Sequence, residues 1–327
     1  MNVSEGNIKD LYEPLLIGTL KKVILSSYFV ILIITSLIGN GFIVAGSFRN
    51  CFIKTDKVTM VFLETLAGLD ILIAIFYVLP AVVTVISGRW LLGQALCFTN
   101  AFVSRALYFN EVFLTVTISC YRLWMLDKPG AVRRQLKIIY LRILLASELV
   151  VSFGITGLML ISRKVKFNPK FLSCTLTAIP NASSPGTIAI GGFFFVGIPI
   201  VIIIVTNSLI VIKAIGKRQI FQRNTMQTSC KGDRKMKLLK GSNAKTFLII
   251  SLVCWVFISC YLPVFILSCF IAVNHKPPAW FSLFSVTILS LTIAANPLVY
   301  GATNQSFRAN CGRTAARIIS LLRNSKD

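Results

Sequence analysis

The sequence predicts an all-α membrane protein: a bundle of seven transmembrane helices followed by a short amphipathic helix at the cytoplasmic surface. Of its 327 residues, 55% are hydrophobic and only 14% are charged, and the mean hydropathy is +0.78. A soluble domain of this length could not bury so much apolar surface. Seven separate apolar runs reach the length of about 20 residues that is needed to cross the hydrocarbon core.

Each run is expected to be helical, because backbone polar groups in lipid must pair within their own segment. In chain order the runs are 23–48, 58–88, 91–124, 143–162, 187–212, 246–273 and 280–303. The run at 143–162 is the least apolar and contains Glu148. We therefore expect an external segment at 1–22, the bundle at 23–303, and the amphipathic helix with a short tail at 304–327.

The basic residues predict the orientation of the bundle. They concentrate in the segments 49–57, 128–137, 217–245 and 308–323. All four fall on one side of a seven-span chain, and the excess of Lys and Arg marks that side as cytoplasmic. The amino terminus is then outside, where the sequons at Asn2 and Asn181 are predicted to be glycosylated. The expected location is the plasma membrane.

The segment 305–322 has an amphipathic pattern. It places Phe307, Cys311 and Ile318 at helical spacings, with arginines between them. Such a helix suits the surface of an anionic inner leaflet, so membrane lipids are expected partners. Cys311 is either palmitoylated there or an unmodified thiol.

Composition excludes several other classes of protein. The net charge of +23 lies mostly in short loops, where it sets topology, so nucleic acid is not an expected partner. The nine cysteines lack metal-ligand spacing, and the single histidine, His275, leaves no residues for metal or histidine-based catalysis. We expect neither an enzyme nor a metal site. A small transporter or channel is the main rival, but it would normally show a repeat or charged rings along a pore.

Short motifs recur in order along the runs. They are Gly39-Asn40, Leu66-Ala67-Gly68-Leu69-Asp70, Tyr121-Arg122-Leu123, Phe257-Ile258-Ser259-Cys260-Tyr261-Leu262-Pro263 and Asn296-Pro297-Leu298-Val299-Tyr300. These are similar to the signatures GN, LAxxD, DRY, FxxCWxP and NPxxY of rhodopsin-like (class A) G-protein-coupled receptors. Together they cover nearly the whole chain, which therefore resembles a member of that family. Residues 304–308 are similar to the start of the last helix in melatonin-type receptors, but five residues do not assign a subfamily.

The resemblance implies a disulfide and a switch. Cys97 and Cys174 would be bonded, tying the second outer loop over the mouth of the bundle. Arg122 would meet a heterotrimeric G protein once helix six swings outward. The residues that would take part in this switch are Arg122, Phe257, Pro263, Asn296, Pro297 and Tyr300. The prolines at 199, 263 and 297 each remove a helical hydrogen bond and mark expected bends.

The resemblance also places a ligand pocket between the helices, lined in part by Ser104, Arg105, Tyr108 and Tyr261. Ser104 stands where amine receptors have aspartate, and Ser290 stands where opsins have lysine, so an amine ligand and a light sensor are disfavoured. Arg105 and the basic outer loops favour an anionic ligand, either a small metabolite or an acidic lipid. In the alternative, Arg105 pairs with a helix carbonyl or an acid.

Several positions depart from the family pattern. Tyr121 replaces the usual acid beside Arg122, and Asn243 replaces another at the base of helix six. A weakened inactive-state lock and raised basal signalling are expected from this. Asn207 replaces a tyrosine that helps to hold the active state, so a receptor-like protein without G-protein signalling is an alternative.

Polar residues within lipid invite a functional interpretation. The cluster expected here contains Asn40, Asp70, Glu111 and Asn296, at positions where the family binds a sodium ion. Glu111 is unusual, since the family often has serine there. Two neighbouring carboxylates repel in a low dielectric, so either they share a cation near Asp70 or one of them is protonated. In the second case, a neutral Glu111 would be hydrogen-bonded to a neighbour.

Overall fold

The structure is a computed structural model that describes residues 18–48, 57–128, 130, 136–161, 165–176, 193–227, 234–273, 275, 277–303 and 312. Within these residues, seven helices are long and apolar enough to cross a membrane. The predicted all-α seven-helix bundle is therefore confirmed. The amphipathic helix predicted at 304–327 lies outside the described residues, apart from Gly312, and so do the sequons at Asn2 and Asn181.

The spans are built from helical segments with a small hairpin between the fourth and the fifth. In chain order the elements are α1 (Thr19–Phe48), α2 (Lys57–Ile73), η2 (Ala74–Val78), α3 (Leu79–Ser87), α4 (Gly93–Asp127), α6 (Ile138–Ile161), β1 (Val165–Asn168), β2 (Ser173–Leu176), η3 (Phe193–Gly197), α8 (Ile198–Gln227), α9 (Arg234–Ala272), α10 (Ala279–Leu289) and α11 (Thr292–Thr303). The first helix begins four residues before the predicted boundary at 23, and the fourth begins five residues before 143. Hydropathy detects only the apolar part of a helix, whereas its hydrogen bonds continue into flanking polar residues.

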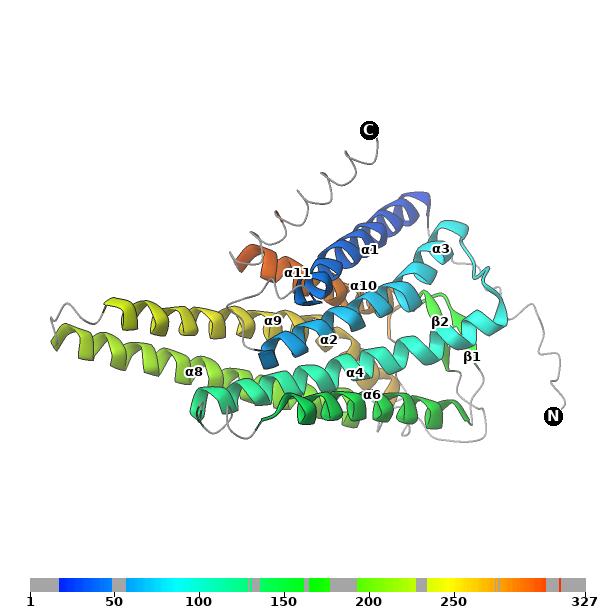
Figure 1. Cartoon of the computed structure of the whole chain (residues 1–327). Helices are drawn as coiled ribbons and strands as arrows, with labels where there is room; N and C mark the ends of the chain where they lie inside the picture. Colours follow the sequence, from blue (N-terminus) through cyan, green and yellow to red (C-terminus); the bar gives the residue numbers. More distant parts are fainter. Residues whose placement is uncertain are drawn as a thin grey trace.

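The long helices run side by side (Figure 1). The hairpin of β1 and β2 lies at one end of the bundle, and the ends of α8 and α9 project at the other. We call these the hairpin end and the Arg122 end. Helix α4 is central and packs against α2, α6, α8 and α9.

The outward faces of the helices remain apolar. Val150 and Leu158 on α6 are 70% and 72% exposed, and similar large side chains line α1 and α8. In water such patches would drive aggregation. The exposed apolar surface therefore fits helices surrounded by lipid.

Two of the helix irregularities come directly before prolines. The π-helical turn η2 precedes Pro80, and the π-helical turn η3 precedes Pro199. Proline has no backbone N–H, so the helix before it must redistribute its hydrogen bonds, and a π turn is one way to do so.

The seventh span corrects a prediction. We expected one helix over 280–303, but the helix is interrupted at Ser290–Leu291. Pro297, where a bend is expected, lies inside α11. At the interruption the backbone tightens, because the Leu291 N–H donates to the Ile288 carbonyl at 3.0 Å. The Ala294 N–H donates to the Leu291 carbonyl at 3.1 Å in the same way. These bonds join residues three apart, as in a 3₁₀ turn.

Candidate functional site

The hairpin forms a lid at its end of the bundle. In the antiparallel pairing, Phe167 lies opposite Cys174, and Phe167 stacks on the buried Trp90 with ring centroids 5.8 Å apart. Cys174 forms a disulfide with Cys97 near the start of α4, with 5.3 Å between their Cα atoms. The predicted disulfide is confirmed, and it ties the hairpin to α4.

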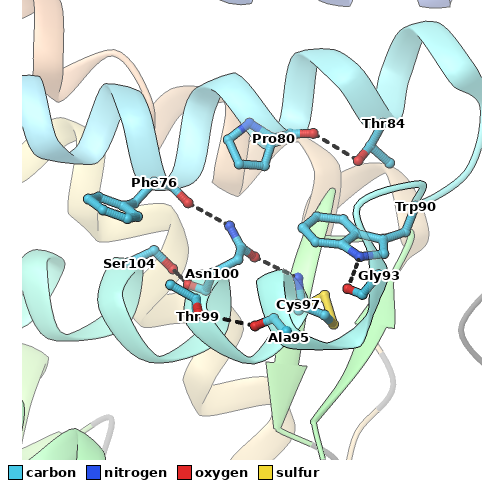
Figure 2. Close-up of a disulfide and its surroundings, with 11 residues drawn as sticks. Phe76, Pro80, Thr84, Trp90, Gly93, Ala95, Cys97, Thr99, Asn100 and Ser104 are labelled. Atoms are coloured by element: carbon cyan, nitrogen blue, oxygen red, sulfur yellow. Dashed lines mark hydrogen bonds between the residues drawn. A yellow bond between two sulfur atoms is a disulfide. The ribbon is translucent and has the colours of Figure 1, made fainter.

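A second tie runs through Asn100, which the sequence did not single out. Pro80 cannot donate a hydrogen bond to the carbonyl four residues earlier, that of Phe76. The Asn100 side-chain amide donates to this carbonyl at 2.7 Å. The Asn100 Oδ1 atom accepts from the Cys174 backbone N–H at 3.0 Å. Figure 2 shows this side chain between the second span and the disulfide. The sequence signal was Pro80 itself, which predicts an unpaired carbonyl at Phe76.

The predicted pocket residues lie on α4 and α9 below the lid. The Ser104 hydroxyl is buried and donates to the Asn100 carbonyl. Arg105 is partly buried and already has an interaction partner. The Tyr108 ring meets the ring of Tyr77 edge-on at 5.4 Å. The Tyr108 hydroxyl is buried without a hydrogen-bond partner among the described residues.

Tyr261 on α9 joins this pocket to the middle of the bundle. Its ring meets that of Tyr108 edge-on at 6.4 Å and stacks on Phe257 at 4.2 Å. Its hydroxyl lies 2.9 Å from Oε2 of Glu111 and 3.2 Å from the Tyr108 carbonyl. Glu111 is fully buried, so this hydrogen bond satisfies an atom that would otherwise lack water.

The polar cluster predicted around Asp70 is assembled from α1, α2 and α11. The Asn296 amide donates to Oδ2 of Asp70 at 2.8 Å, while Oδ1 of Asp70 is buried without a partner among the described residues. The Asn40 amide donates to the Ile293 carbonyl at 2.9 Å and to the Ser36 hydroxyl at 3.1 Å. The Ile293 carbonyl is the one that Pro297 leaves without its helical donor. The Asn40 side chain therefore donates to the backbone carbonyl that lacks a helical donor because of Pro297.

A cavity continues from Glu111 towards Arg122. Its volume is about 30 Å³, and most of its wall is apolar, including Phe62, Leu66 and Phe257. Glu111, Thr115, Arg122, Thr292 and Asn296 contribute the polar part of the wall. The structure thus brings residues predicted for the polar cluster and for the switch to one internal space.

The Arg122 end contains a restraint that no sequence motif predicts. Arg122 is 9% exposed and forms no ion pair with a carboxylate of the described residues. Tyr121 packs on Phe62 with ring centroids 5.2 Å apart. The Nζ atom of Lys213 on α8 instead pairs with Oδ2 of Asp127 on α4 at 2.6 Å. No motif marks this pair, because its partners lie 86 residues apart.

The structure shows few contacts for the remaining predicted positions. The Asn207 amide donates to the Ser251 carbonyl at 3.2 Å, which joins α8 to α9. Glu148, which had no assigned role, accepts a hydrogen bond from the Thr117 hydroxyl. Pro263 lies inside α9, and Tyr300 belongs to the last turns of α11. The side chains of Tyr300 and Asn243 lie outside the described part of the chain.

Comparison with known proteins supports one family. The family model described as "7 transmembrane receptor (rhodopsin family)" matches residues 39–300. The melatonin receptor type 1B of Rattus norvegicus is 25% identical over 312 residues, which cover 91% of this chain and 78% of that receptor. The melatonin receptor type 1A of Mus musculus is 25% identical, with 84% and 75% covered. A D(1)-like dopamine receptor of Oreochromis mossambicus is 24% identical, with 85% and 75% covered.

Proposed function

The chain belongs to the rhodopsin family of seven-transmembrane receptors, and on this premise we propose that it signals by an outward movement of α9, triggered by a ligand at the hairpin end. Membership makes it a G-protein-coupled receptor that spans the plasma membrane several times, and the family is one of signalling receptors, not of enzymes. Its partners are therefore an extracellular ligand and a heterotrimeric G protein.

We propose that the hairpin end faces the outside of the cell and the Arg122 end faces the cytoplasm. The basic segments at 49–57, 128–137 and 217–245 join the helices at the Arg122 end, and an excess of Lys and Arg is typical of cytoplasmic loops. The disulfide belongs to the hairpin end, where an oxidising environment would preserve it. Epitope tags at both ends of the chain would test this orientation. Finding both tags in one compartment would exclude it.

The observation that carries the proposed mechanism is the position of Tyr261. Its ring lies against Tyr108 in the pocket and against Phe257 beside the cavity, and its hydroxyl is held by Glu111. A ligand that shifts Tyr108 or Tyr261 would weaken the hydrogen bond to Glu111. Because Tyr261 and Phe257 both belong to α9, loss of that hydrogen bond frees α9 to move away from α4. Differential contacts of this kind are what allow a ligand to shift a conformational equilibrium.

The ligand that we propose first is anionic, a small metabolite or an acidic lipid. The charge of Arg105 and the basic residues of the hairpin, Lys166 and Lys170, support it. The aromatic walls at Tyr77, Tyr108 and Tyr261 add stacking surface, and the Tyr108 hydroxyl can donate to an acceptor.

A neutral aromatic ligand is the second candidate. The matched relatives include melatonin receptors, and Arg105 already has a partner within the protein. A panel of acidic metabolites, acidic lipids and melatonin, read out by nucleotide exchange, separates the two candidates. Arg105→Gln should weaken an anionic agonist at least tenfold, because a charge-assisted hydrogen bond contributes about 1.5–3 kcal/mol. A neutral agonist should keep its potency in the same variant.

The transduction step has its own test. Tyr261→Phe keeps the ring but loses the hydrogen bond to Glu111, so basal nucleotide exchange on the responsive G protein should rise. The matched control is Tyr28→Phe, which removes a 2.8 Å hydrogen bond to the Thr287 carbonyl and leaves the hydrogen bond between Tyr261 and Glu111 in place. Background exchange in the wild type with every G protein of a full panel would instead favour the non-signalling alternative.

We also propose that the cluster around Asp70 takes a sodium ion. The unpartnered Oδ1 of Asp70 supports this, since a buried carboxylate oxygen without a donor among the described residues suits a cation. Bound sodium would neutralise one carboxylate and hold α2 close to α4 and α11. Glu111→Ser should reduce the difference in thermal stability between sodium and potassium buffers. An unchanged difference would exclude Glu111 from the cation site.

A further inference from the structure

Arg122 lies at an internal cavity and is nine-tenths buried. Four helices line the cavity, and most of the wall is apolar, with Phe62 and Leu66 of α2, Ile118 of α4, Val253 of α9 and Ala295 of α11 among its residues. Its other polar lining residues are Glu111, Thr115, Thr292 and Asn296. A guanidinium group carries five N–H donors and a permanent charge, so it needs acceptors here.

The protein supplies no acidic partner among the described residues. Arg122 forms no ion pair there; Asp127, at the same end of α4, is paired with Lys213, and Glu64 of α2 is not among the residues that line the cavity. The adjacent residue is Tyr121, and α9 has no Asp or Glu between Arg234 and Ala272. Glu111 lines the same cavity, but its Oε2 accepts from Tyr261.

An unpaired buried cation is unfavourable enough that a mobile counter-ion or water must compensate it. The surroundings favour a counter-ion. The chain has 34 Lys and Arg against 11 Asp and Glu, and the excess lies in the segments that join the helices at this end. A positive potential of this kind raises the local concentration of anions.

The size of the cavity limits the choice of anion. Its volume of about 30 Å³ is roughly twice the space that one ordered water requires. A halide ion fits such a space, whereas a phosphate ester or a nucleotide does not. We propose that Arg122 and this cavity form a binding site for a small monovalent anion, with chloride as its representative.

The site would favour the resting conformation. Val253, Cys254 and Phe257, which form one wall, belong to α9, so outward movement of α9 opens the cavity. The anion would then be lost, and Arg122 would become available to the G protein. Bound chloride would thus provide the negative charge beside Arg122 that Tyr121 and Asn243 do not provide.

Thermal unfolding of the purified receptor in uncharged lipid nanodiscs tests the site without a G protein. Sodium chloride is compared with sodium gluconate at equal concentration, so the sodium proposed at Asp70 stays constant. A ligand present at ten times its Kd for the folded state should raise Tm by roughly 2 °C, and the shift should grow with the logarithm of the chloride concentration. Equal Tm values for the wild type in the two salts overturn the proposal, whatever the variants do.

Two arginine variants test whether the chloride-dependent rise in Tm comes from binding at Arg122. Arg122→Gln should abolish the chloride shift, while Arg142→Gln, an exposed arginine on α6, should keep it. If Arg122→Gln retains the shift, or Arg142→Gln loses it, chloride acts elsewhere and the proposal fails. Because the readout is Tm, a receptor that did not activate G proteins would leave this result intact, so the two proposals fail independently.

Discussion

The side-chain amide of Asn100 on α4 donates a 2.7 Å hydrogen bond to the carbonyl of Phe76 in the π turn of the second span. Its Oδ1 atom simultaneously accepts from Cys174 at the hairpin. One side chain thus connects α4, the second span and the lid over the pocket. A second asparagine, Asn40, has the same role at Ile293, four residues before Pro297.

Asn100→Leu should destabilise the receptor. The change leaves the Phe76 carbonyl and the Cys174 N–H buried without partners, at a cost of about 1–3 kcal/mol for each group. Thermal unfolding measures the loss. Thr99→Val is the matched control, since the Thr99 hydroxyl bonds to the Ala95 carbonyl of its own helix. Similar Tm values for the two variants would show that the Asn100 bridge contributes nothing.

Gly39→Ala should destabilise the contact between α1 and α11. A Cβ atom at Gly39 would overlap the Pro297 ring, with its Cγ only 2.8 Å away. Overpacking of this kind typically costs about 1–3 kcal/mol. Gly41→Ala on the same helix is the control, because an added methyl group there would meet no described atom within 4 Å. The prediction fails if both alanine variants unfold at the wild-type temperature.

Breaking the Lys213–Asp127 ion pair should raise basal nucleotide exchange. The pair holds α8 against α4 at the Arg122 end, beside the helix that moves. Its side chains are 38% and 39% exposed, so its contribution is at most about 1 kcal/mol, or roughly fivefold in exchange. Lys213→Ala and Asp127→Ala should therefore act similarly. The exchanged pair, Lys213→Asp with Asp127→Lys, should restore wild-type exchange, and failure to do so would argue against a direct pairing effect.

Glu111 and Tyr261 should be energetically coupled. Glu111→Leu leaves the Tyr261 hydroxyl with only the Tyr108 carbonyl, and Tyr261→Phe leaves Oε2 of Glu111 without its donor. Tyr261→Phe should cost about 1–3 kcal/mol because it strands a buried carboxyl oxygen, and Glu111→Leu should cost less because the Tyr261 hydroxyl keeps the Tyr108 carbonyl as its acceptor. The double variant should cost less than the sum of the two, which a double-mutant cycle of unfolding free energies detects. Additive costs would mean that the hydrogen bond does not contribute to stability.

Much of the fold could be predicted from the sequence because the information is local. A span requires about 20 apolar residues in a row, and seven such runs occur. The disulfide between Cys97 and Cys174 followed from resemblance to the family, and the structure contains it. The boundaries were less accurate, since polar residues such as Lys137 and Tyr140 flank or extend the helix without adding hydropathy.

The sequence alone determined that several prolines would leave carbonyl groups unpaired, since proline lacks an N–H wherever it stands. It could not determine which side chain would reach each carbonyl. Asn100 reaches the Phe76 carbonyl, and Asn40 reaches the Ile293 carbonyl, only because of how neighbouring helices are rotated and tilted against one another. The ion pair between Lys213 and Asp127 depends on the same arrangement. That arrangement results from packing between segments distant in the chain, so only the tertiary structure decided it.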